Sequence, residues 1–162
     1  MKKRRLVITG LLAIGAVLVL SSCGGGGSGG NKRLTKEQFV AKAGALCVSF
    51  KQQETAARKT AGNLANPTPK VLVSYLEKTT PLYEKRIAGL KKLKPPTGDE
   101  ATVNQIVALE TKEADVAKQL IAALKKNDVA KANTLLTSGN ANSTKARSLY
   151  TRLGVTECAK SN

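Results

Sequence analysis

Apolar residues recur every three or four positions along four segments of this chain, and residues typical of helix ends bound each segment. The expected helices run from Thr35 to the Gly62-Asn63 pair, from Thr68 to Lys94, from Thr97 to about Lys126, and from Asp128 to the residue before Gly154. Aromatic residues make up 3% of the chain and Trp is absent, so Leu, Val, Ile and Ala must build the core. This composition favours helices over a sheet, which draws on β-branched and aromatic residues.

The ends of these segments carry residues that cap helices. Thr35 with Gln38, and Thr97 with Glu100, match the capping box, in which two side chains satisfy free backbone N–H groups. Gly154 is typical of the residue after a helix, because glycine adopts the left-handed conformation without strain. Short connections between the four segments favour an all-α fold, an antiparallel up-down four-helix bundle.

Two of the expected helices contain residues that disturb helical structure. Pro81 lies inside the second helix and predicts a kink or a short break, because proline has no N–H to donate. The Ser138-Gly139-Asn140 run weakens the middle of the fourth helix. The fourth segment therefore forms either one helix or two.

The start of the chain has the order of a secretory signal. Basic residues 2–5 precede an apolar stretch from Leu6 to Leu20, which is short for a membrane span of about twenty residues. Leu20-Ser21-Ser22-Cys23 resembles the bacterial lipobox. This resemblance implies cleavage before Cys23, a diacylglyceryl group on its thiol, often a further acyl chain such as palmitate on its amine, and anchoring at the extracytoplasmic face of the cell membrane. The alternatives are an uncleaved anchor helix and an ordinary signal with an unmodified cysteine.

Glycine occupies positions 24–30 except for Ser28, and such a segment is typical of a flexible tether. Directly after a lipidated cysteine, a tether would hold the domain away from the lipid headgroups. We therefore divide the chain into a signal peptide at 1–22, a lipidated Cys23 with its tether at 23–33, and a helical bundle domain at 34–162.

Cys47 and Cys158 are the two cysteines of the predicted domain. An extracytoplasmic domain lies in an oxidising compartment, which favours a disulfide between them. The bundle topology supports this pairing, because the start of the first helix and the end of the fourth lie at the same end. The alternative is two unpaired thiols in the core. A disulfide would leave neither sulfur free as a nucleophile or a metal ligand.

The sequence offers little material for catalysis. Histidine is absent, which excludes Ser-His-Asp and Cys-His arrangements and histidine-containing zinc sites. Glu110 and Glu113 fall near the apolar stripe of the third segment, where two inward carboxylates could bind a cation. Alternatively, both reach the helix edge, or one pairs with a Lys or Arg of a neighbouring helix. We therefore predict no enzymatic activity, no metal site and no cofactor.

The most informative surface feature is charge, with 27 Lys and Arg against 11 Asp and Glu. Lys78, Lys85 and Lys92 are seven residues apart and share one face of the second helix. Such a basic stripe would bind an anionic lipid, a wall polymer or an acidic protein. The alternative is a solvated face that keeps the domain soluble. Nucleic acid is not expected as a partner, because the predicted location disfavours it and few aromatic side chains are available for stacking.

Three short patterns in the domain resemble the small helical lipoproteins of actinobacteria and related lineages. They are Ala43-x-x-x-Cys47, Leu90-x-x-Leu93-x-Pro95-Pro96 and Leu153-Gly154-Val155-x-x-Cys158. The resemblance would cover residues 34–159. It implies the helical fold and the disulfide, and it carries no active site.

Three functions are compatible with these features. The preferred one is a non-enzymatic binding or structural module of the cell envelope that engages an anionic partner through the second helix. The alternative is a small-ligand carrier with a cavity inside the bundle, which small core residues and Pro81 would favour. The third is an enzyme or metal protein that uses Glu110 and Glu113, which requires those side chains to converge.

Overall fold

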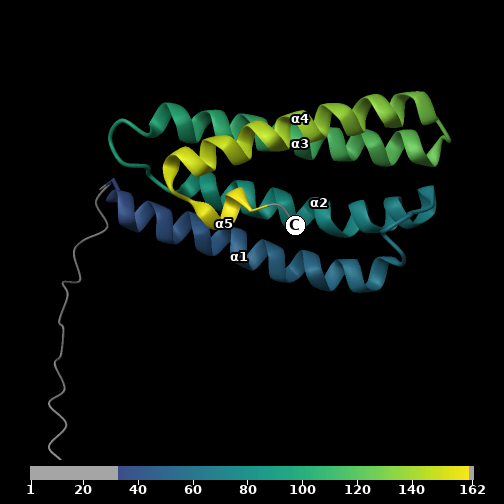
Figure 1. Ribbon diagram of the computed structural model, residues 1–162, viewed down its shortest axis with the longest axis horizontal. Helices are drawn as coiled ribbons and strands as arrows, with labels where there is room; N and C mark the ends of the chain where they lie inside the picture. Colours follow the sequence, from purple (N-terminus) through teal and green to yellow (C-terminus); the bar gives the residue numbers. More distant parts are fainter. Residues whose placement is uncertain (1–32, 161–162) are drawn as a thin grey trace, which may run out of the picture. The chain divides into compact units, whose positions relative to one another are not determined.

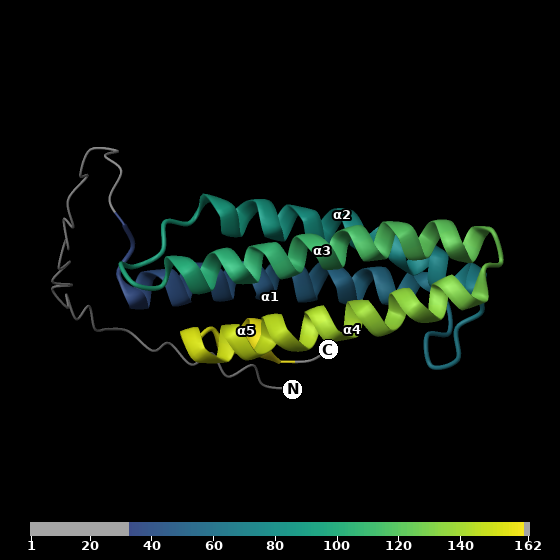
Figure 2. The same ribbon diagram turned by 90° about the horizontal axis from the view of Figure 1, so that it is seen from above.

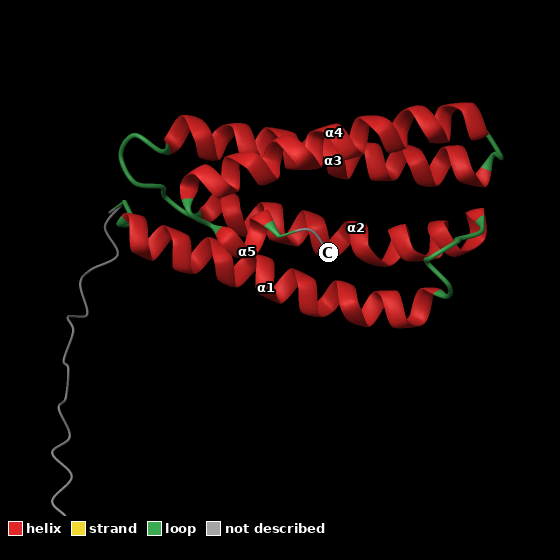
Figure 3. Cartoon of the chain, in the orientation of Figure 1, coloured by secondary structure: helices red, strands yellow, loops and turns green. Residues whose placement is uncertain are grey.

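The computed structural model describes residues 33–160, and this part of the chain is helical without a β-strand (Figure 3). Its elements are α1 (Lys36–Ala61), α2 (Pro69–Lys92), α3 (Glu100–Lys125), α4 (Val129–Leu153) and the short α5 (Thr156–Ala159). The predicted signal peptide, Cys23 and nearly all of the tether lie outside the described residues. The four long helices confirm the four segments expected from the apolar pattern.

Consecutive long helices run antiparallel and pack against one another in the order α1, α2, α3, α4 (Figure 1). Viewed from two directions, α1 and α2 form one layer and α3 and α4 the other (Figures 1 and 2). The short α5 folds back after α4 and contacts both α1 and α4. The predicted up-down four-helix bundle is therefore confirmed, with α5 as an element between the first and last helices.

Three of the predicted helix ends form as expected. The Thr35 hydroxyl accepts from the backbone N–H of Gln38, and the Gln38 side chain accepts from the backbone N–H of Thr35, which completes a capping box. The Asp128 carboxylate caps α4 by accepting from the N–H of Lys131 at 3.0 Å. Gly154 ends α4 with φ 79°, in the left-handed region that glycine tolerates.

The predicted start of the third helix at Thr97 is wrong, because α3 begins at Glu100. Gly98 has φ 93°, which is incompatible with a right-handed helix and delays its start. The Glu100 carboxylate accepts from the N–H of Gly98 at 2.6 Å, so it does not complete a capping box with Thr97. The sequence showed the correct residue types but not the turn that separates them.

The predicted disturbances in the second and fourth helices do not interrupt them. α2 runs through Pro81 as one helix. Pro81 and Glu77 are both exposed, so solvent can reach the Glu77 carbonyl that has lost its usual N–H partner. α4 passes through Gly139 without a break, so the single-helix alternative holds. A Cβ on Gly139 would lie 3.4 Å from Cγ1 of Val116, so glycine here allows close contact between α3 and α4.

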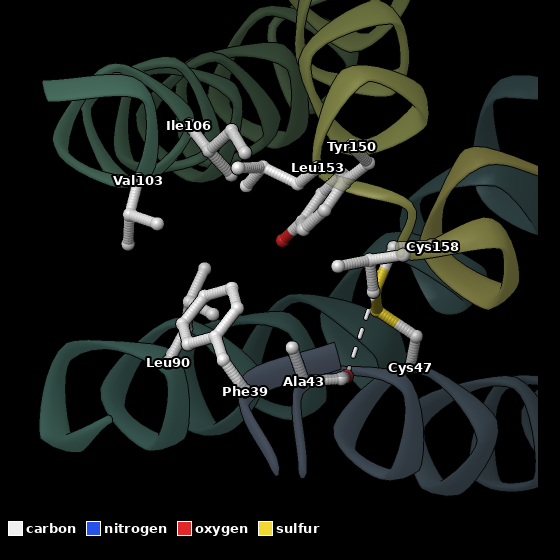
Figure 4. Packing of buried hydrophobic residues seen from close by; sticks show 10 residues of the cluster. Phe39, Ala43, Cys47, Leu90, Val103, Ile106, Tyr150, Leu153 and Cys158 are labelled. Carbon is white, nitrogen blue, oxygen red and sulfur yellow. Dashed lines mark hydrogen bonds between the residues drawn. A yellow bond between two sulfur atoms is a disulfide. The ribbon is translucent and has the colours of Figure 1, made fainter. Parts of the chain in front are cut away.

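The main apolar core lies at the end of the bundle where α1 begins and α4 ends. It includes Phe39, Ile106 and Val155, each at most 1% exposed, together with Leu90 and Leu153 (Figure 4). A smaller apolar cluster near the opposite end joins α3 to α4 through Leu120, Ala123 and Ala132. The middle of the bundle, between these two clusters, is built differently.

The disulfide between Cys47 and Cys158 is present and borders the main core (Figure 4). It joins α1 to α5 across 111 residues of sequence. The structure therefore confirms the predicted pairing and the reason for it, since the antiparallel topology brings the start of α1 and the end of α4 together.

Candidate functional site

A cavity of about 270 Å³ lies in the middle of the bundle. One water molecule needs only about 10–15 Å³ on this measure, so the cavity has room for a small molecule. Its walls come from all four long helices and from Cys158 and Lys160 near the C-terminus. Among the lining residues, Arg147 is half-buried and Lys160 is exposed.

An ion pair between Arg86 of α2 and Glu110 of α3 occupies the buried side of this cavity. The Arg86 guanidinium donates to Oε1 of Glu110 at 2.7 Å, and the two side chains are 11% and 1% exposed. The guanidinium also lies over two aromatic rings, 4.8 Å from the centroid of Phe50 and 4.4 Å from that of Tyr83. This position holds the cation by cation–π attraction as well as by its charged partner.

Each tyrosine of the chain donates its hydroxyl proton to a glutamate on a neighbouring helix. Tyr150 of α4 donates to Oε1 of Glu110 at 2.8 Å, and Tyr83 of α2 donates to Oε2 of Glu113 at 2.7 Å. Tyr75 of α2 donates to Oε1 of Glu54 of α1. All six side chains line the same cavity. Three facing pairs of helices are therefore joined by charge-assisted hydrogen bonds.

Each of these glutamates also faces an arginine. Glu110 is paired with Arg86, and the charges of Arg86 and, more weakly, of Arg147 act on Glu113. Glu54 accepts from Arg58 at 3.3 Å, and the Arg58 guanidinium lies 5.4 Å from the ring centroid of Tyr75. We call these three groups the Tyr–Glu–Arg sets; their members are Tyr75, Glu54 and Arg58, then Tyr150, Glu110 and Arg86, then Tyr83, Glu113 and Arg147.

Burial changes the protonation of these groups in consistent directions. It raises the pKa of all three tyrosines, and the nearby glutamates raise it further, so the hydroxyls remain protonated donors. Burial also raises the pKa of Glu113, against the hydrogen bond from Tyr83 and the charges of Arg86 and Arg147. The pKa of Glu110 is raised by the same cause, against the charge of Arg86 and the hydrogen bond from Tyr150.

The guanidinium of Arg86 stays charged in this setting. Burial by itself would lower the pKa of Arg86, but the surrounding acidic groups, Glu110 foremost, outweigh burial and raise that pKa. The Arg86 guanidinium therefore stays protonated in its ion pair with Glu110.

Two buried polar atoms of this pair have no hydrogen-bond partner among the described residues. They are Nε of Arg86, a donor, and Oε2 of Glu110, an acceptor. Both atoms are buried from solvent, and they belong to the two side chains that already form an ion pair through Nη2 and Oε1. Both side chains line the cavity, which makes the cavity the candidate binding site.

The structure answers the open question about Glu110 and Glu113. They do converge on one cavity, and Glu110 pairs with an arginine of a neighbouring helix, which was one of the alternatives raised from the sequence. Among residues 33–160, no group of three or more acidic, cysteine or histidine side chains gathers around them. Cys158 lines the cavity as half of a disulfide, so it offers no thiol there.

The three predicted anion-binding lysines lie on the surface of α2, away from this cavity. Lys78, Lys85 and Lys92 are all exposed. The Lys78 ammonium donates to the backbone carbonyl of Thr60 at 3.1 Å, so part of its hydrogen-bonding capacity is used inside the protein. Arg86 does not belong with these surface cations, since it points into the bundle.

The most important residues that the sequence reasoning missed are Arg86 and Glu54. Both occupy apolar positions of a helical pattern: Arg86 comes three residues after Tyr83 and four before buried Leu90, and Glu54 falls four residues after Phe50 and three before buried Ala57. A charged residue at a core-facing position is a detectable signal. It cannot tell which charges meet, because that depends on the faces of the other helices.

Comparison with protein-family models, with curated proteins and with solved structures gives no match. Among residues 33–160, no helix has both the length and the apolar character needed to cross a bilayer. The class of this protein therefore follows from its own fold and site. It is a disulfide-linked four-helix bundle with a polar cavity at its centre.

Proposed function

We propose that this chain is a lipid-anchored, extracytoplasmic protein of the cell envelope that binds a small polar ligand in the cavity between its helices. The observation that carries the proposal is the cavity of about 270 Å³ in the middle of the bundle, which is lined by Arg86, Glu110 and Glu113. Binding sites of this kind combine a concave space with a few fixed polar groups.

The arrangement of the polar side chains that line the cavity supports binding more than catalysis. The tyrosine hydroxyls are held as donors by glutamates, and the Arg86 guanidinium is fixed between two rings. These groups already have partners within the bundle, and such preorganisation lowers the entropic cost of recognition. We therefore propose a non-enzymatic role.

The proposed location depends on the start of the sequence. A basic segment, an apolar stretch and Leu20-Ser21-Ser22-Cys23 stand in the order of a lipoprotein signal. Replacing Cys23 by Ser should release the protein from the membrane fraction, because the acyl chains supply the anchor. Retention of the Cys23→Ser protein in the membrane fraction would show that another segment holds it.

The binding role is tested by filling the cavity. In Ala117→Phe, a ring replaces a small lining side chain of α3. Full-length protein and this variant are screened by thermal melting against small polar compounds of both charge signs and of none. We expect at least one class to raise the Tm of the native protein and not that of the variant. Val129→Ala, far from the cavity and 67% exposed, is the control. If no class shifts the native protein, the binding proposal is lost.

Binding of an anionic partner by α2 is a second candidate function. Lys85 and Lys92 are exposed, one heptad apart, and neither has an ion-pair partner within residues 33–160. Vesicles containing an anionic phospholipid should bind the native protein in low salt and bind Lys78→Glu/Lys85→Glu/Lys92→Glu more weakly. Equal binding of both proteins would exclude the stripe as a binding surface.

A further inference from the structure

Resting on the proposed function, we propose that the cavity ligand is a small zwitterion of the amino-acid type, whose ammonium pairs with Glu113 and whose carboxylate pairs with Arg147. The proposal names a ligand class for the site, namely small molecules that carry one positive and one negative group. It assigns the positive end of the ligand to α3 and the negative end to α4.

The first step of the argument is the pairing of the charged side chains around the cavity. The charged lining residues are Glu54, Arg86, Glu110, Glu113, Arg147 and Lys160. Four of them have ion-pair partners; the pairs are Arg86–Glu110 at 2.7 Å, Glu54–Arg58 at 3.3 Å and Lys160–Glu157 at 2.6 Å. Within residues 33–160, Glu113 and Arg147 form no ion pair, either with each other or with another residue. One carboxylate and one guanidinium therefore face the same cavity without an ion-pair partner.

The Tyr–Glu–Arg sets differ in this respect. In the sets of Glu54 and Glu110, the glutamate and its arginine are in ion-pair contact. In the third set, the charge of Arg147 lowers the pKa of Glu113, so the two lie near each other without closing an ion pair. A charge withdrawn from water is costly unless a group of opposite charge compensates it. A zwitterion would give each of the two a partner and leave the net charge of the cavity unchanged.

The second step concerns the atoms of Glu113 that a ligand can reach. Tyr83 donates to Oε2 at 2.7 Å, and Oε1 makes no hydrogen bond within residues 33–160. Glu113 is half-buried, and its Oε1 is not closed off from solvent as Oε2 of Glu110 is. Burial raises the pKa of Glu113 despite the charges of Arg86 and Arg147, so the carboxylate is incompletely compensated. An ammonium, which brings three donors, would supply what is missing.

The other end of the ligand would meet two side chains of α4. Ser143 and Arg147 are four residues apart, so they share one face of the helix, and both line the cavity. Nη2 of Arg147 donates to the Thr144 hydroxyl at 3.3 Å, and its other N–H groups make no hydrogen bond within residues 33–160. The Ser143 hydroxyl is likewise without a hydrogen bond in this part of the chain. A guanidinium beside a hydroxyl can hold a carboxylate by charge-assisted hydrogen bonds.

The third step is size. A cavity of about 270 Å³ falls at the lower end of typical ligand pockets, which begin at roughly 300 Å³. Leu76, Ala114, Ala117 and Ala146 supply apolar surface to its walls. An amino acid with a small apolar side chain suits this volume and lining better than an extended chain does.

The experiment compares ligands of similar shape that differ in charge. Full-length protein is titrated near neutral pH with L-alanine, L-valine and L-leucine. Each is matched by its amide, which keeps only the ammonium, and by the acid without the amino group, which keeps only the carboxylate. Binding is followed by amide chemical shifts of residues around the cavity. We expect at least one amino acid to bind at least about tenfold more tightly than both of its matched compounds, because each of those lacks one ionic contact.

Two variants assign the two ends of the ligand. In Glu113→Gln, the amino acid should lose its advantage over the acid without the amino group, because its ammonium has lost a partner. In Arg147→Gln, it should lose its advantage over the amide. A general loss of packing would weaken all three ligands alike and leave their ratios unchanged. Glu77→Gln and Arg152→Gln make the same changes at exposed residues of α2 and α4 and should bind like the native protein. Thermal melting checks that each variant is folded.

The possible results separate this proposal from the function on which it rests. An amide or an acid that binds in the cavity as tightly as its amino acid would overturn the zwitterion class and leave the cavity a binding site. Unchanged ratios in folded Glu113→Gln or Arg147→Gln would overturn the contact assigned to that residue. If no amino acid shifts cavity resonances while another compound raises the Tm of the native protein but not of Ala117→Phe, only the zwitterion is lost. If no compound of any class does so, both proposals fail.

Discussion

The end of the bundle that carries the disulfide and the middle of the same bundle are built from the same helices in opposite ways. At the end, Phe39 and Ile106 pack among aliphatic side chains and are at most 1% exposed. In the middle, the equally buried Glu110 is paired with Arg86 beside an open cavity. Tyr150 belongs to both regions: its ring packs in the apolar cluster (Figure 4), and its hydroxyl donates to Glu110.

This difference separates stability from recognition. Apolar burial stabilises the fold by about 25 cal/mol for each Å² removed from water. A buried ion pair contributes little net stability, because desolvation of two charges offsets their attraction. A sequence under pressure for stability alone would fill the middle with Leu and Ile. The polar cluster therefore fits the proposed binding role better than a role in stability.

Removing the disulfide at the apolar end should lower the free energy of unfolding more than any other change considered. Closing a loop of 111 residues stabilises a protein by roughly 4–5 kcal/mol on the chain-entropy model. We expect Cys47→Ser/Cys158→Ser to lose about that much free energy of unfolding in urea. The native protein in reductant should lose a similar amount. A loss under about 1 kcal/mol would mean that packing alone closes this end.

Breaking the ion pair on one side should have the next largest effect. Arg86→Leu leaves the buried Glu110 carboxylate without its cation, which costs about 3–5 kcal/mol in urea unfolding. Lys85→Leu, the neighbouring exposed position, should change stability by less than about 0.5 kcal/mol.

Replacing both partners sharpens the comparison between the two regions. Arg86→Met/Glu110→Leu removes the unpaired charge together with its partner, so it should recover most of the stability that Arg86→Leu loses. Compounds that raise the Tm of the native protein should not raise the Tm of this double variant. Full binding by this protein would show that the polar pair serves the fold and not the ligand.

Shortening a side chain of the apolar core should lower the free energy of unfolding somewhat less than removing Arg86 does. Ile106→Ala removes buried methyl and methylene groups beside Leu90 and Val103, and such changes destabilise by about 3 kcal/mol. Val129→Ala on the exposed surface of α4 should be close to neutral in the same urea titration. The Tm shift by compounds that bind the native protein should persist in folded Ile106→Ala, because Ile106 does not line the cavity.

The smallest effect concerns pH in the polar middle. The pKa of Glu113 is raised by burial, so the folded state holds its proton more tightly than the unfolded state, and this residue's contribution to stability falls as pH rises above about 4.5. The Tm of Glu113→Gln relative to the native protein should therefore increase from pH 4 to pH 7. Glu37→Gln should show the opposite trend, because the pKa of Glu37 is lowered by backbone and Thr35 hydrogen bonds.

Much of the fold could be predicted from local patterns. The apolar spacing gave four helices, and the caps at Thr35, Asp128 and Gly154 formed as expected. The prediction at Thr97 was wrong, because the left-handed Gly98 lies between the two residues of the apparent capping box. Residue types specify which caps are possible, and backbone geometry decides which one forms.

The candidate site could be predicted only in part. Glu110 and Glu113 stood out because they are charged residues beside an apolar stripe, and the same signal was present at Arg86 and Glu54. Arg86 and Glu110 are 24 residues apart in the sequence. They pair because α2 and α3 are rotated about their axes so that the two side chains meet. No local pattern contains that rotation.

The sequence by itself determined the helical class, the positions of the long helices and the two cysteines able to meet, because periodicity, helix-end residues and short connections act over a few residues. Only the tertiary structure decided that Tyr75, Tyr83 and Tyr150 would each face a glutamate and that the space between them would stay open. The physical reason is that these contacts join different helices, and their geometry is set when all four pack together.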